Sequence, residues 1–511
     1  MPDVSQMQGL TNKLAEITAS VSSFLPEISL AVSIIIILIY DLITHKRQRQ
    51  YLLLFALVAL LLTGYLTSLQ WLSASRGAEE FLFNDMLVLD KASIFAKFVF
   101  LVAGILTILM SWPDRAHKPM LSIPGEQVIL LVGLVLGTFL LCMSVNLLMV
   151  YLALELISLC SYILCTMNGD KPGSEAGLKF ILFGAVSSAF MLYGMSLFYG
   201  FTGSLHINDP SFVAGLETIH WLPLTVAGLL VISGFLFKIA AFPFQVWAPD
   251  VYQGSPTPIV AFFSVAPKIA GLFILIRFTN AYSFVDLATY WQEILAAVAI
   301  LSMTVGNFAA IRQKNAKRML AYSSIAHGGF LLCGLVTFTD FGLSALLFYA
   351  AIYVLMNFAA FLIVMLLEGK THSLEMDTFK GLGLKFPVLG VLTIVAMIAL
   401  TGLPPTAGFT AKFLIFSSIW AAYASSAKPI LLYLLIFGLF NTVISLAYYL
   451  KIPYLLFFKE SAVTMVSDRK DYLKNILLVF LIIPIILLFF KSEWLLYIIN
   501  SITFVFQKVH K

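Results

Sequence analysis

FGLSALLFYAAIYVLMNFAAFLIVMLLE, residues 341–368, carries no charged residue before its last position. A helix needs about 20 mostly apolar residues to cross the ~30 Å hydrocarbon core of a bilayer. This stretch is longer than that, and it has no Pro to interrupt a helix. It therefore predicts a transmembrane helix.

The rest of the chain has the same apolar character. Its 511 residues are 60% hydrophobic and 11% charged, with a mean hydropathy of +0.97. Charged residues make up about 25% of an ordinary soluble domain. We therefore expect an integral, multi-pass membrane protein, with no room for a large soluble catalytic domain.

Apolar runs of about 17 or more residues, bounded by Gly, Pro or charge, recur along the sequence. Ser144–Asn146 alone separates the fourth run from the fifth, and residues 491–506 form either a membrane-surface helix or part of the last span. The expected fold is all-α. The runs predict about fourteen spans, near 24–44, 51–72, 85–111, 125–145, 147–167, 174–201, 223–249, 257–279, 288–311, 318–338, 341–368, 386–421, 430–457 and 472–490.

Lys and Arg residues are distributed unevenly between the two sides of these spans. Loops that follow odd-numbered spans hold most of them, including HKRQRQ (45–50) and RQKNAKR (312–318). Cytoplasmic loops are enriched in Lys and Arg. The asymmetry predicts an even number of spans, with both termini on the non-cytoplasmic side. The net charge of +5 is spread over loops without a basic patch, which argues against a nucleic-acid partner.

The cysteines and the N-terminus indicate neither a metal site nor a cleaved signal peptide. The N-terminal 20 residues are polar and include Asp3 and Glu16, unlike a basic region followed by a short apolar one. The cysteines lack CxxC spacing and occur in apolar stretches, so they are read as small buried side chains: Cys142, Cys160, Cys165 and Cys333.

Several lysines fall inside the predicted spans. Lys91, Lys97 and Lys451 lie near span ends, so we expect their amines to reach the membrane interface. Lys179, five residues into its span, is compatible with either a structural or a functional role. The remaining lysines lie deeper and are more informative: Lys238, Lys268 and Lys412.

These three lysines and Glu155 occupy positions where a charge is costly. A charged side chain at the centre of a membrane helix costs about 2.5–3.5 kcal/mol, so it usually faces a protein or water-filled interior and serves transport. A structural ion pair with Glu155 is the competing interpretation. Burial favours a neutral lysine, whereas a nearby carboxylate favours a charged one. Movement of Glu155 relative to a lysine could therefore load and release a proton.

Two of the lysines lie beside helix breakers, in FKIAAFPFQVWAPD (237–250) and TGLPPTAGFTAK (401–412). Broken helices at corresponding positions of two halves indicate the ion site of a transporter. Lys238 and Lys412 lie 174 positions apart, which favours an inverted repeat of five spans. Aligning the prolines instead sets Lys412 opposite Asp250, so the register stays open.

Polar residues recur at helical spacing near these charges. His327 suits a proton relay because its ordinary pKa is near ~6.5, although a satisfied buried histidine is the alternative. We expect these faces to meet along a hydrated axis in mid-membrane. The polar residues are Tyr151, Ser158, Tyr162, Ser264, Ser323, Ser324, Tyr349, Tyr353, Asn357, Asn441, Ser445 and Tyr449.

Four motifs together resemble the antiporter-like subunit N (subunit 2) family of proton-pumping NADH:quinone oxidoreductase, respiratory complex I. The resemblance extends over about residues 24–490. The motifs are LALELISLCSY (152–162), WAPDVYQGSPTPIVAFFSVAPKIA (247–270), KRMLAYSSIAHGGF (317–330) and GLPPTAGFTAKF (402–413).

The resemblance implies a proton-translocation role for six residues. It makes Glu155 the modulating glutamate of the fifth span, Lys238 the pump lysine of the seventh and Lys268 the connector of the eighth. It makes Lys412 the terminal lysine of the twelfth span, and it assigns Lys179 to the sixth and His327 to the tenth. The implied fold has fourteen helices with two inverted five-helix bundles. The corresponding segments are 1–23, 24–111, 125–279, 288–457 and 472–511.

The resemblance also implies that the chain is a subunit of a translocase with no redox centre or cofactor of its own. NADH, FMN, iron–sulfur clusters and quinone would belong to partner subunits, which include larger antiporter-like ones. The implied location is the bacterial inner membrane.

Two other functions remain open. One is an Mrp-type cation/proton antiporter subunit, and the other is a structural membrane spacer whose charges form static ion pairs. The electron donor is also open, because photosynthetic relatives belong to a complex fed by ferredoxin.

Overall fold

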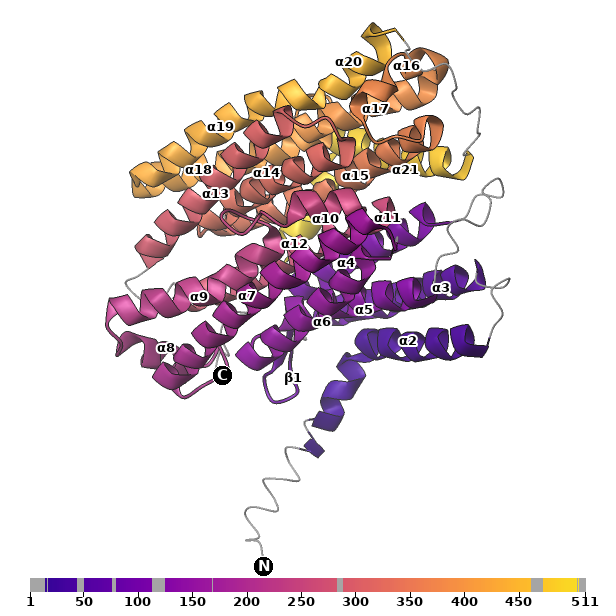
Figure 1. The fold of residues 1–511 in the computed structure, drawn as a ribbon. Helices are drawn as coiled ribbons and strands as arrows, with labels where there is room; N and C mark the ends of the chain where they lie inside the picture. Colours follow the sequence, from indigo (N-terminus) through magenta and orange to yellow (C-terminus); the bar gives the residue numbers. More distant parts are fainter. Residues whose placement is uncertain are drawn as a thin grey trace, which may run out of the picture.

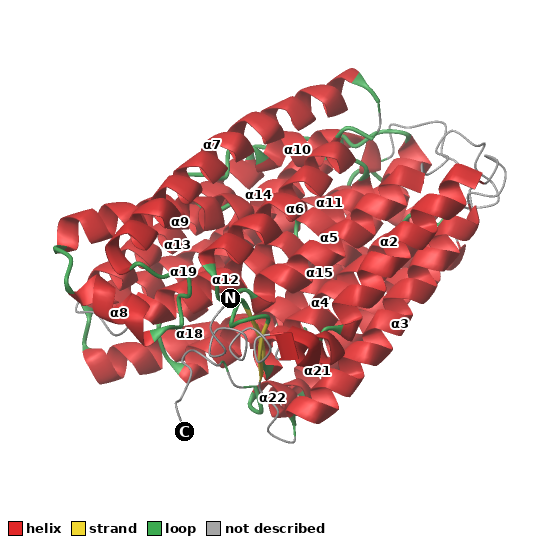
Figure 2. Cartoon of the chain, turned by 90° about the horizontal axis from the view of Figure 1, so that it is seen from below, coloured by secondary structure: helices red, strands yellow, loops and turns green. Residues whose placement is uncertain are grey.

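The structure is a computed structural model that describes residues 14–43 except 16, 50–75, 80–112, 125–167, 169–282, 288–460, 472–502 and 504. Residues 45–49 of the HKRQRQ loop, most of segment 1–23 and the C-terminal residues after 504 lie outside the described residues. Helices run side by side through almost the whole described chain (Figures 1 and 2). The expected all-α fold is confirmed.

Thirteen helical segments among the described residues are long and apolar enough to cross a membrane. The remaining expected span, 386–421, is divided into two helices, neither of which is counted among the thirteen. Large apolar side chains on the outer helices are exposed in the isolated chain, as suits a surface that meets lipid or partner subunits.

The N-terminal helices pack against a short β-hairpin. The hairpin corrects the expected start of the third span at residue 85, because residues 87–89 form a strand and the helix begins at Lys91. Asp90 caps that helix by accepting a hydrogen bond from the Ser93 amide (2.8 Å). These elements are α2 (Leu25–Ile43), α3 (Gln50–Ala74), β1 (Glu80–Leu82), β2 (Leu87–Leu89) and α4 (Lys91–Met110).

The first bundle contains the break expected near Pro243. Its first two helices are separated as expected, because Asn146 caps the second of them through hydrogen bonds from the amides of Leu148 and Met149. The elements are α5 (Gly125–Met143), α6 (Leu147–Cys165), α7 (Lys171–Thr202), α8 (Pro210–Glu217), α9 (Trp221–Ile239), α10 (Ala248–Gly254), α11 (Thr257–Phe263) and α12 (Ala266–Tyr282).

The second bundle also contains a broken helix, at Gly402, whose φ of 85° ends one helix before the next begins. Figure 1 shows the short helices α10 and α11 of the first bundle in the middle of the molecule, where they meet α14 and α15 of the second bundle. The elements are α13 (Ala288–Ile311), α14 (Ala316–Val336), α15 (Asp340–Thr371), η2 (Met376–Phe379), α16 (Leu382–Lys385), α17 (Pro387–Thr401), α18 (Ala407–Ser426), α19 (Pro429–Tyr449) and α20 (Lys451–Phe458).

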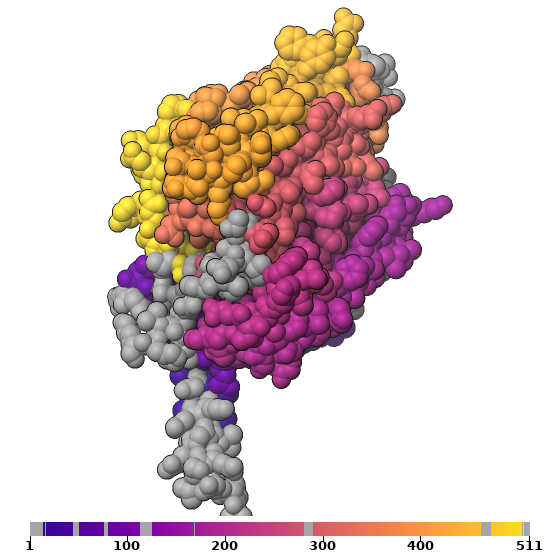
Figure 3. Space-filling model, turned by 90° about the vertical axis from the view of Figure 1, so that its left-hand side faces the viewer, coloured from indigo at the N-terminus to yellow at the C-terminus, as the bar shows by residue number. Residues whose placement is uncertain are grey.

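Two C-terminal helices complete the described chain. Helix α21 (Tyr472–Phe490) packs against α15 and α18. It lies on the flank of the second bundle, where the yellow surface meets the orange one in Figure 3. A separate short helix, α22 (Ser492–Ile499), follows, so the stretch expected at 491–506 does not simply continue the last span.

Candidate functional site

Lys238 lies in the last turn of α9, next to the break in the first bundle. Its side chain is buried, and Nζ donates a hydrogen bond to Oγ of Ser158 on α6 (2.9 Å). Ser158 in turn donates to the carbonyl of Leu154 (2.7 Å). The next residues leave the helix, since Ala240 adopts a left-handed conformation with φ 56°. A lysine amine is therefore held by a neutral hydroxyl at a helix end.

Glu155 lies on α6 less than one turn before Ser158, and it is half-buried. Its carboxylate accepts a hydrogen bond from Ser188 on α7. Glu155 and Lys238 form no ion pair, but they lie close enough for their charges to interact. A small movement of either side chain would therefore change the electrostatic field at Lys238.

Lys268 lies on α12 and is fully buried. Its Nζ donates to the backbone carbonyl of Ser324 on α14 (2.9 Å). One turn further along α12, Gly271 lets the helix approach α9 closely, since a Cβ there would lie 3.5 Å from Cβ of Lys238. The helices that carry Lys238 and Lys268 are thus in direct contact.

His327 on α14 lies between two buried tyrosines of the second bundle. Hydrogen bonds join Nδ1 to the Tyr349 hydroxyl (2.6 Å) and Nε2 to the Tyr449 hydroxyl (2.8 Å). A neutral imidazole has one donor and one acceptor nitrogen, so one phenol accepts and the other donates. The arrangement can reverse its direction by exchanging donors and acceptors, which is the property that a proton relay needs.

Lys412 lies on α18, just after the break in the second bundle. Its Nζ donates to the backbone carbonyls of Leu400 (3.3 Å) and Thr401 (2.7 Å), which end α17. The amine also lies 4.5 Å from the ring centre of Phe330, one turn beyond His327 on α14. The C-terminal carbonyls of a helix favour a cation, so they stabilise the ammonium form.

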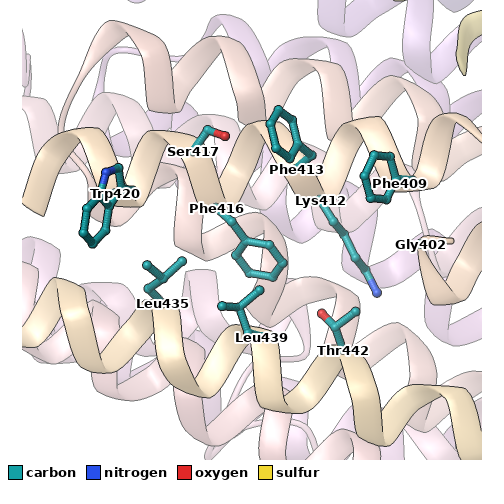
Figure 4. Close-up of a pocket in the computed structure, with 10 residues that line it drawn as sticks. All are labelled: Gly402, Phe409, Lys412, Phe413, Phe416, Ser417, Trp420, Leu435, Leu439 and Thr442. Carbon is teal, nitrogen blue, oxygen red and sulfur yellow. The ribbon is translucent and has the colours of Figure 1, made fainter. Parts of the chain in front are cut away.

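A cavity of about 440 Å³ opens beside Lys412. Figure 4 shows it between α18 and α19, with the Lys412 side chain extending toward Gly402 and Thr442. Its walls are mostly apolar, including Phe413 and Trp420, which are exposed in the isolated chain. Lys412 therefore lies next to the outer surface of the bundle.

The three deep lysines share one property. Lys238, Lys268 and Lys412 all donate to neutral oxygens, and none forms an ion pair with any residue that the structure describes. Their helices connect through α14, because a Cβ at Gly328 on α14 would lie 3.5 Å from Ile239, the residue after Lys238. The structure thus places Lys238, Lys268, His327 and Lys412 on α14 and on helices that contact it. Glu155 lies next to this group, on the helix whose Ser158 accepts from Lys238.

Lys179 is placed elsewhere. Its Nζ pairs with Asp250 (2.9 Å) and with Glu175 (2.9 Å), and it is 40% exposed in the isolated chain. Arg318 donates to the other oxygen of Asp250. Asp250 lies in the connection between two spans. Burial alone would raise the pKa of the Asp250 carboxyl, but the hydrogen bonds from Lys179 and Arg318 hold that pKa below its ordinary value.

The expectation that Lys97 reaches the membrane interface is wrong. Lys97 is fully buried, and its Nζ lies 2.6 Å from Oε1 of Glu27, which is equally buried. Gln70 accepts a further hydrogen bond from Lys97 (3.0 Å). The sequence did contain a signal, because Glu27 and Gln70 lie within the first two predicted spans and needed a buried partner. Lys91 and Lys451 are half-buried.

A second buried ion pair was also not predicted from the sequence. Arg277 donates to both carboxylate oxygens of Asp90 (2.9 and 3.0 Å) and to the carbonyl of Cys142 (2.9 Å). It ties α12 to the start of α4 and the end of α5. Within the described part of the chain, no group of three or more His, Cys, Asp or Glu residues could hold a metal ion.

Comparison with known proteins decides the family. Residues 144–445 match the family model described as "NADH:quinone oxidoreductase/Mrp antiporter, TM". The chain belongs to the NADH:quinone oxidoreductase/Mrp antiporter family. The resemblance expected from the four motifs is thereby confirmed, and the region matched includes all six candidate residues.

Curated members of this family resemble the chain over most of its length. NADH-quinone oxidoreductase subunit N 2 of Chloroherpeton thalassium is 37% identical over 492 residues, which cover 94% of each chain. NADH-quinone oxidoreductase subunit N of Chlorobium chlorochromatii is 39% identical over 468 residues, covering 90% of this chain and 89% of the relative.

Two solved structures have the same fold as this chain. A chain of respiratory complex I from Thermus thermophilus with bound Aureothin has a TM-score of 0.76 and 30% identity, covering 92% of this chain and 98% of that one. A chain of the membrane-bound sulfane sulfur reductase, an archaeal respiratory complex, has a TM-score of 0.83 at 23% identity over 94% of this chain and 96% of that one, and this likeness concerns the fold alone.

Proposed function

We propose that this chain translocates protons as an antiporter-like membrane subunit of an NADH:quinone oxidoreductase, the respiratory complex I type. Quinone reduction in other subunits drives the movement, and this chain performs no redox chemistry itself. The proton carriers are Glu155, Lys238, Lys268, His327 and Lys412. Lys179, the sixth residue expected from the sequence, lies apart from these five and is paired with Asp250.

The observation that carries this proposal is the bonding of the deep lysines to neutral oxygens. A lysine paired with a buried carboxylate leaves that carboxylate as an uncompensated charge when it releases its proton, whereas a lysine bonded to hydroxyl or carbonyl oxygens leaves only neutral partners behind. Lys238, Lys268 and Lys412 are all bonded in the second way. Such lysines can exchange protons, and this argues against a spacer with static ion pairs.

The relay between the bundles follows from the helix contacts. Lys268 reaches α14 at Ser324, less than one turn before His327. From His327, the path continues past Phe330 to Lys412. Water molecules complete the path where side chains do not touch. Protons then move sideways, along the plane of the membrane, between the two broken helices.

The placement of the protein in the cell is part of the same proposal. The uneven distribution of Lys and Arg supports both termini on the non-cytoplasmic side, and the bacterial relatives support the inner membrane. Its partners are the other membrane subunits, including larger antiporter-like ones. NADH, FMN, iron–sulfur clusters and quinone bind to partner subunits. We also propose that the chain is divided into the segments 1–23, 24–111, 125–279, 288–457 and 472–511.

An Mrp-type cation/proton antiporter is the second candidate, because the matching family includes Mrp antiporters. A chain of the Mrp complex from Dietzia has a TM-score of 0.74 at 21% identity, which supports the fold alone. A requirement for sodium in reconstituted vesicles would favour this candidate over proton pumping.

The test is the Lys238→Ala variant in the whole complex, reconstituted into vesicles. We expect the complex to assemble and reduce quinone, with proton uptake per electron lowered. The control is Lys380→Ala, which removes a lysine paired with Asp377 outside the spans. Unchanged proton uptake in the assembled Lys238→Ala complex would refute the proposal.

A further inference from the structure

Asp250 connects three helices that carry different parts of the site. It belongs to α10, the short helix that follows the break after Lys238. One carboxylate oxygen accepts from Lys179 on α7 (2.9 Å), and the other accepts from Arg318 on α14. Arg318 donates as well to Oε1 of Gln253 on α10 (3.1 Å). A single carboxylate therefore ties α10 to α7 in the first bundle and to α14 in the second.

Trp247, three residues before Asp250, connects the same segment to Lys238. Its indole stacks on Phe180 of α7, with ring centres 4.3 Å apart and planes 13° from parallel. Its Nε1–H donates to the carbonyl of Phe237 (3.2 Å), and Phe237 is the residue before Lys238. The indole is thus bonded directly to the backbone that positions the Lys238 side chain.

The two contacts of this segment with α7 are made by residues that are close together in the sequence on each of the two segments. Lys179 and Phe180 are consecutive on α7, and they contact Asp250 and Trp247, which lie within one turn of each other. The helices also meet closely further along, because a Cβ at Gly254 would lie 2.9 Å from the Pro172 carbonyl. Helix α10 therefore has little freedom to shift against α7 while the Lys179–Asp250 pair is intact.

We propose that Asp250 is a positioning residue, which holds the segment after the break and, through Trp247, the backbone beside Lys238. Lys179 and Arg318 serve as its fixed cationic partners. This inference rests on the proposed role of Lys238 in proton translocation. It gives Lys179 a role different from that of a proton carrier: its ammonium has two carboxylate partners, Glu175 and Asp250, which suits a permanent cation.

The decisive experiment compares Lys179→Arg with Asp250→Asn in the whole complex, reconstituted into vesicles. Arginine keeps the ion pair with Asp250 but does not release its proton in proteins. We expect Lys179→Arg to pump at nearly the wild-type ratio of protons to electrons. We expect Asp250→Asn to assemble and to pump about tenfold more slowly, because a hydrogen-bonded charge pair is lost. The control is Asp377→Asn, which removes an exposed ion pair with Lys380.

A third variant tests the link to Lys238. Trp247→Phe keeps an aromatic ring against Phe180 but removes the donor to the Phe237 carbonyl, so we expect slower pumping in an assembled complex. Pumping by Trp247→Phe at the wild-type rate would contradict this link. If Asp250→Asn does not assemble, Lys179→Arg still decides the role of Lys179.

The outcomes separate this inference from the proposed function. Loss of pumping in Lys179→Arg would make Lys179 a proton carrier and overturn the inference. Wild-type pumping by assembled Asp250→Asn would also overturn it. The proposed function is tested independently by Lys238→Arg, which we expect to abolish this route because arginine cannot release a proton. Wild-type pumping by Lys238→Arg would refute the proposed function but leave the two Asp250 contacts to be judged by their own variants.

Discussion

Buried cations are bonded differently in two regions of this molecule. Around the N-terminal helix α4, Lys97 faces Glu27 at 2.6 Å, and Arg277 of α12 faces Asp90 at 2.9 Å. Along the proposed axis, Lys238, Lys268 and Lys412 are just as deeply buried, but their hydrogen-bond acceptors are a serine hydroxyl and backbone carbonyls. Burial alone therefore does not distinguish the two groups.

The difference lies in what happens when a proton leaves. Deprotonating Lys97 would strand a buried carboxylate without its counter-ion, which is strongly unfavourable. Deprotonating Lys238 leaves an amine that can still donate to the Ser158 hydroxyl. Paired charges thus hold helices together, whereas cations bonded to neutral oxygens are free to change their protonation state. The following variants test this distinction.

The largest effect is a loss of stability, and we expect it where a buried cation is paired with a carboxylate. Lys97→Met leaves Glu27 buried without its cation, which should destabilise the assembled complex by roughly 3–5 kcal/mol. The measurement is the temperature at which the purified complex loses its quinone reductase activity, with proton uptake measured on the fraction that remains assembled. That fraction should pump normally.

The double variant Lys97→Met with Glu27→Gln provides the control. Removing both charges should recover part of the lost stability, because no uncompensated charge remains. If Lys97→Met were stable but unable to pump, Lys97 would belong with Lys238, and the distinction between the two regions would fail.

Glu155→Gln should slow proton translocation along the axis without preventing assembly of the complex. The variant removes the negative charge that acts on Lys238 but keeps a group able to accept from Ser188. We expect pumping to fall by about tenfold, equivalent to roughly 1.4 kcal/mol. Proton uptake per electron in reconstituted vesicles measures this effect, and an unimpaired proton yield would remove Glu155 from the mechanism.

Ser158→Ala should give the smallest effect. It removes the hydroxyl that accepts from Lys238, a neutral group worth about 1 kcal/mol, so pumping should slow only a few-fold. Ser161→Ala is the matched control, because Ser161 is buried on the same helix and donates to the Ile157 carbonyl. Equal effects of the two variants, measured as initial rates of proton uptake, would indicate a general disturbance of α6.

Much of this arrangement was predictable from the sequence. Long apolar runs predicted the spans, and prolines predicted the breaks beside Lys238 and Lys412. Asn146 marked a helix start between two runs that hydropathy alone would have merged. Depth within a span also identified the three deep lysines, because a charge far from both span ends has few alternatives to an interior position.

Pairing between distant segments was not predictable. Lys97 lies near the start of its span, where a long side chain usually reaches the interface; its true partner, Glu27, lies on another helix 70 positions earlier. Likewise, Lys179 looked like the other span lysines, and only the fold brings Asp250 to it. The spacing of residues in the sequence shows which of them share a face of one helix. Ion pairs between helices depend instead on how the helices are packed.

The protonation state of Lys238 during turnover tests the account most directly. Infrared difference spectra of the reconstituted complex, with lysine isotopically labelled and Lys238→Arg used to assign the signal, would follow the Lys238 amine as quinone is reduced. We predict a signal from Lys238 that alternates between ammonium and neutral amine in step with proton uptake. An ammonium signal that never changes while the complex pumps would contradict the account.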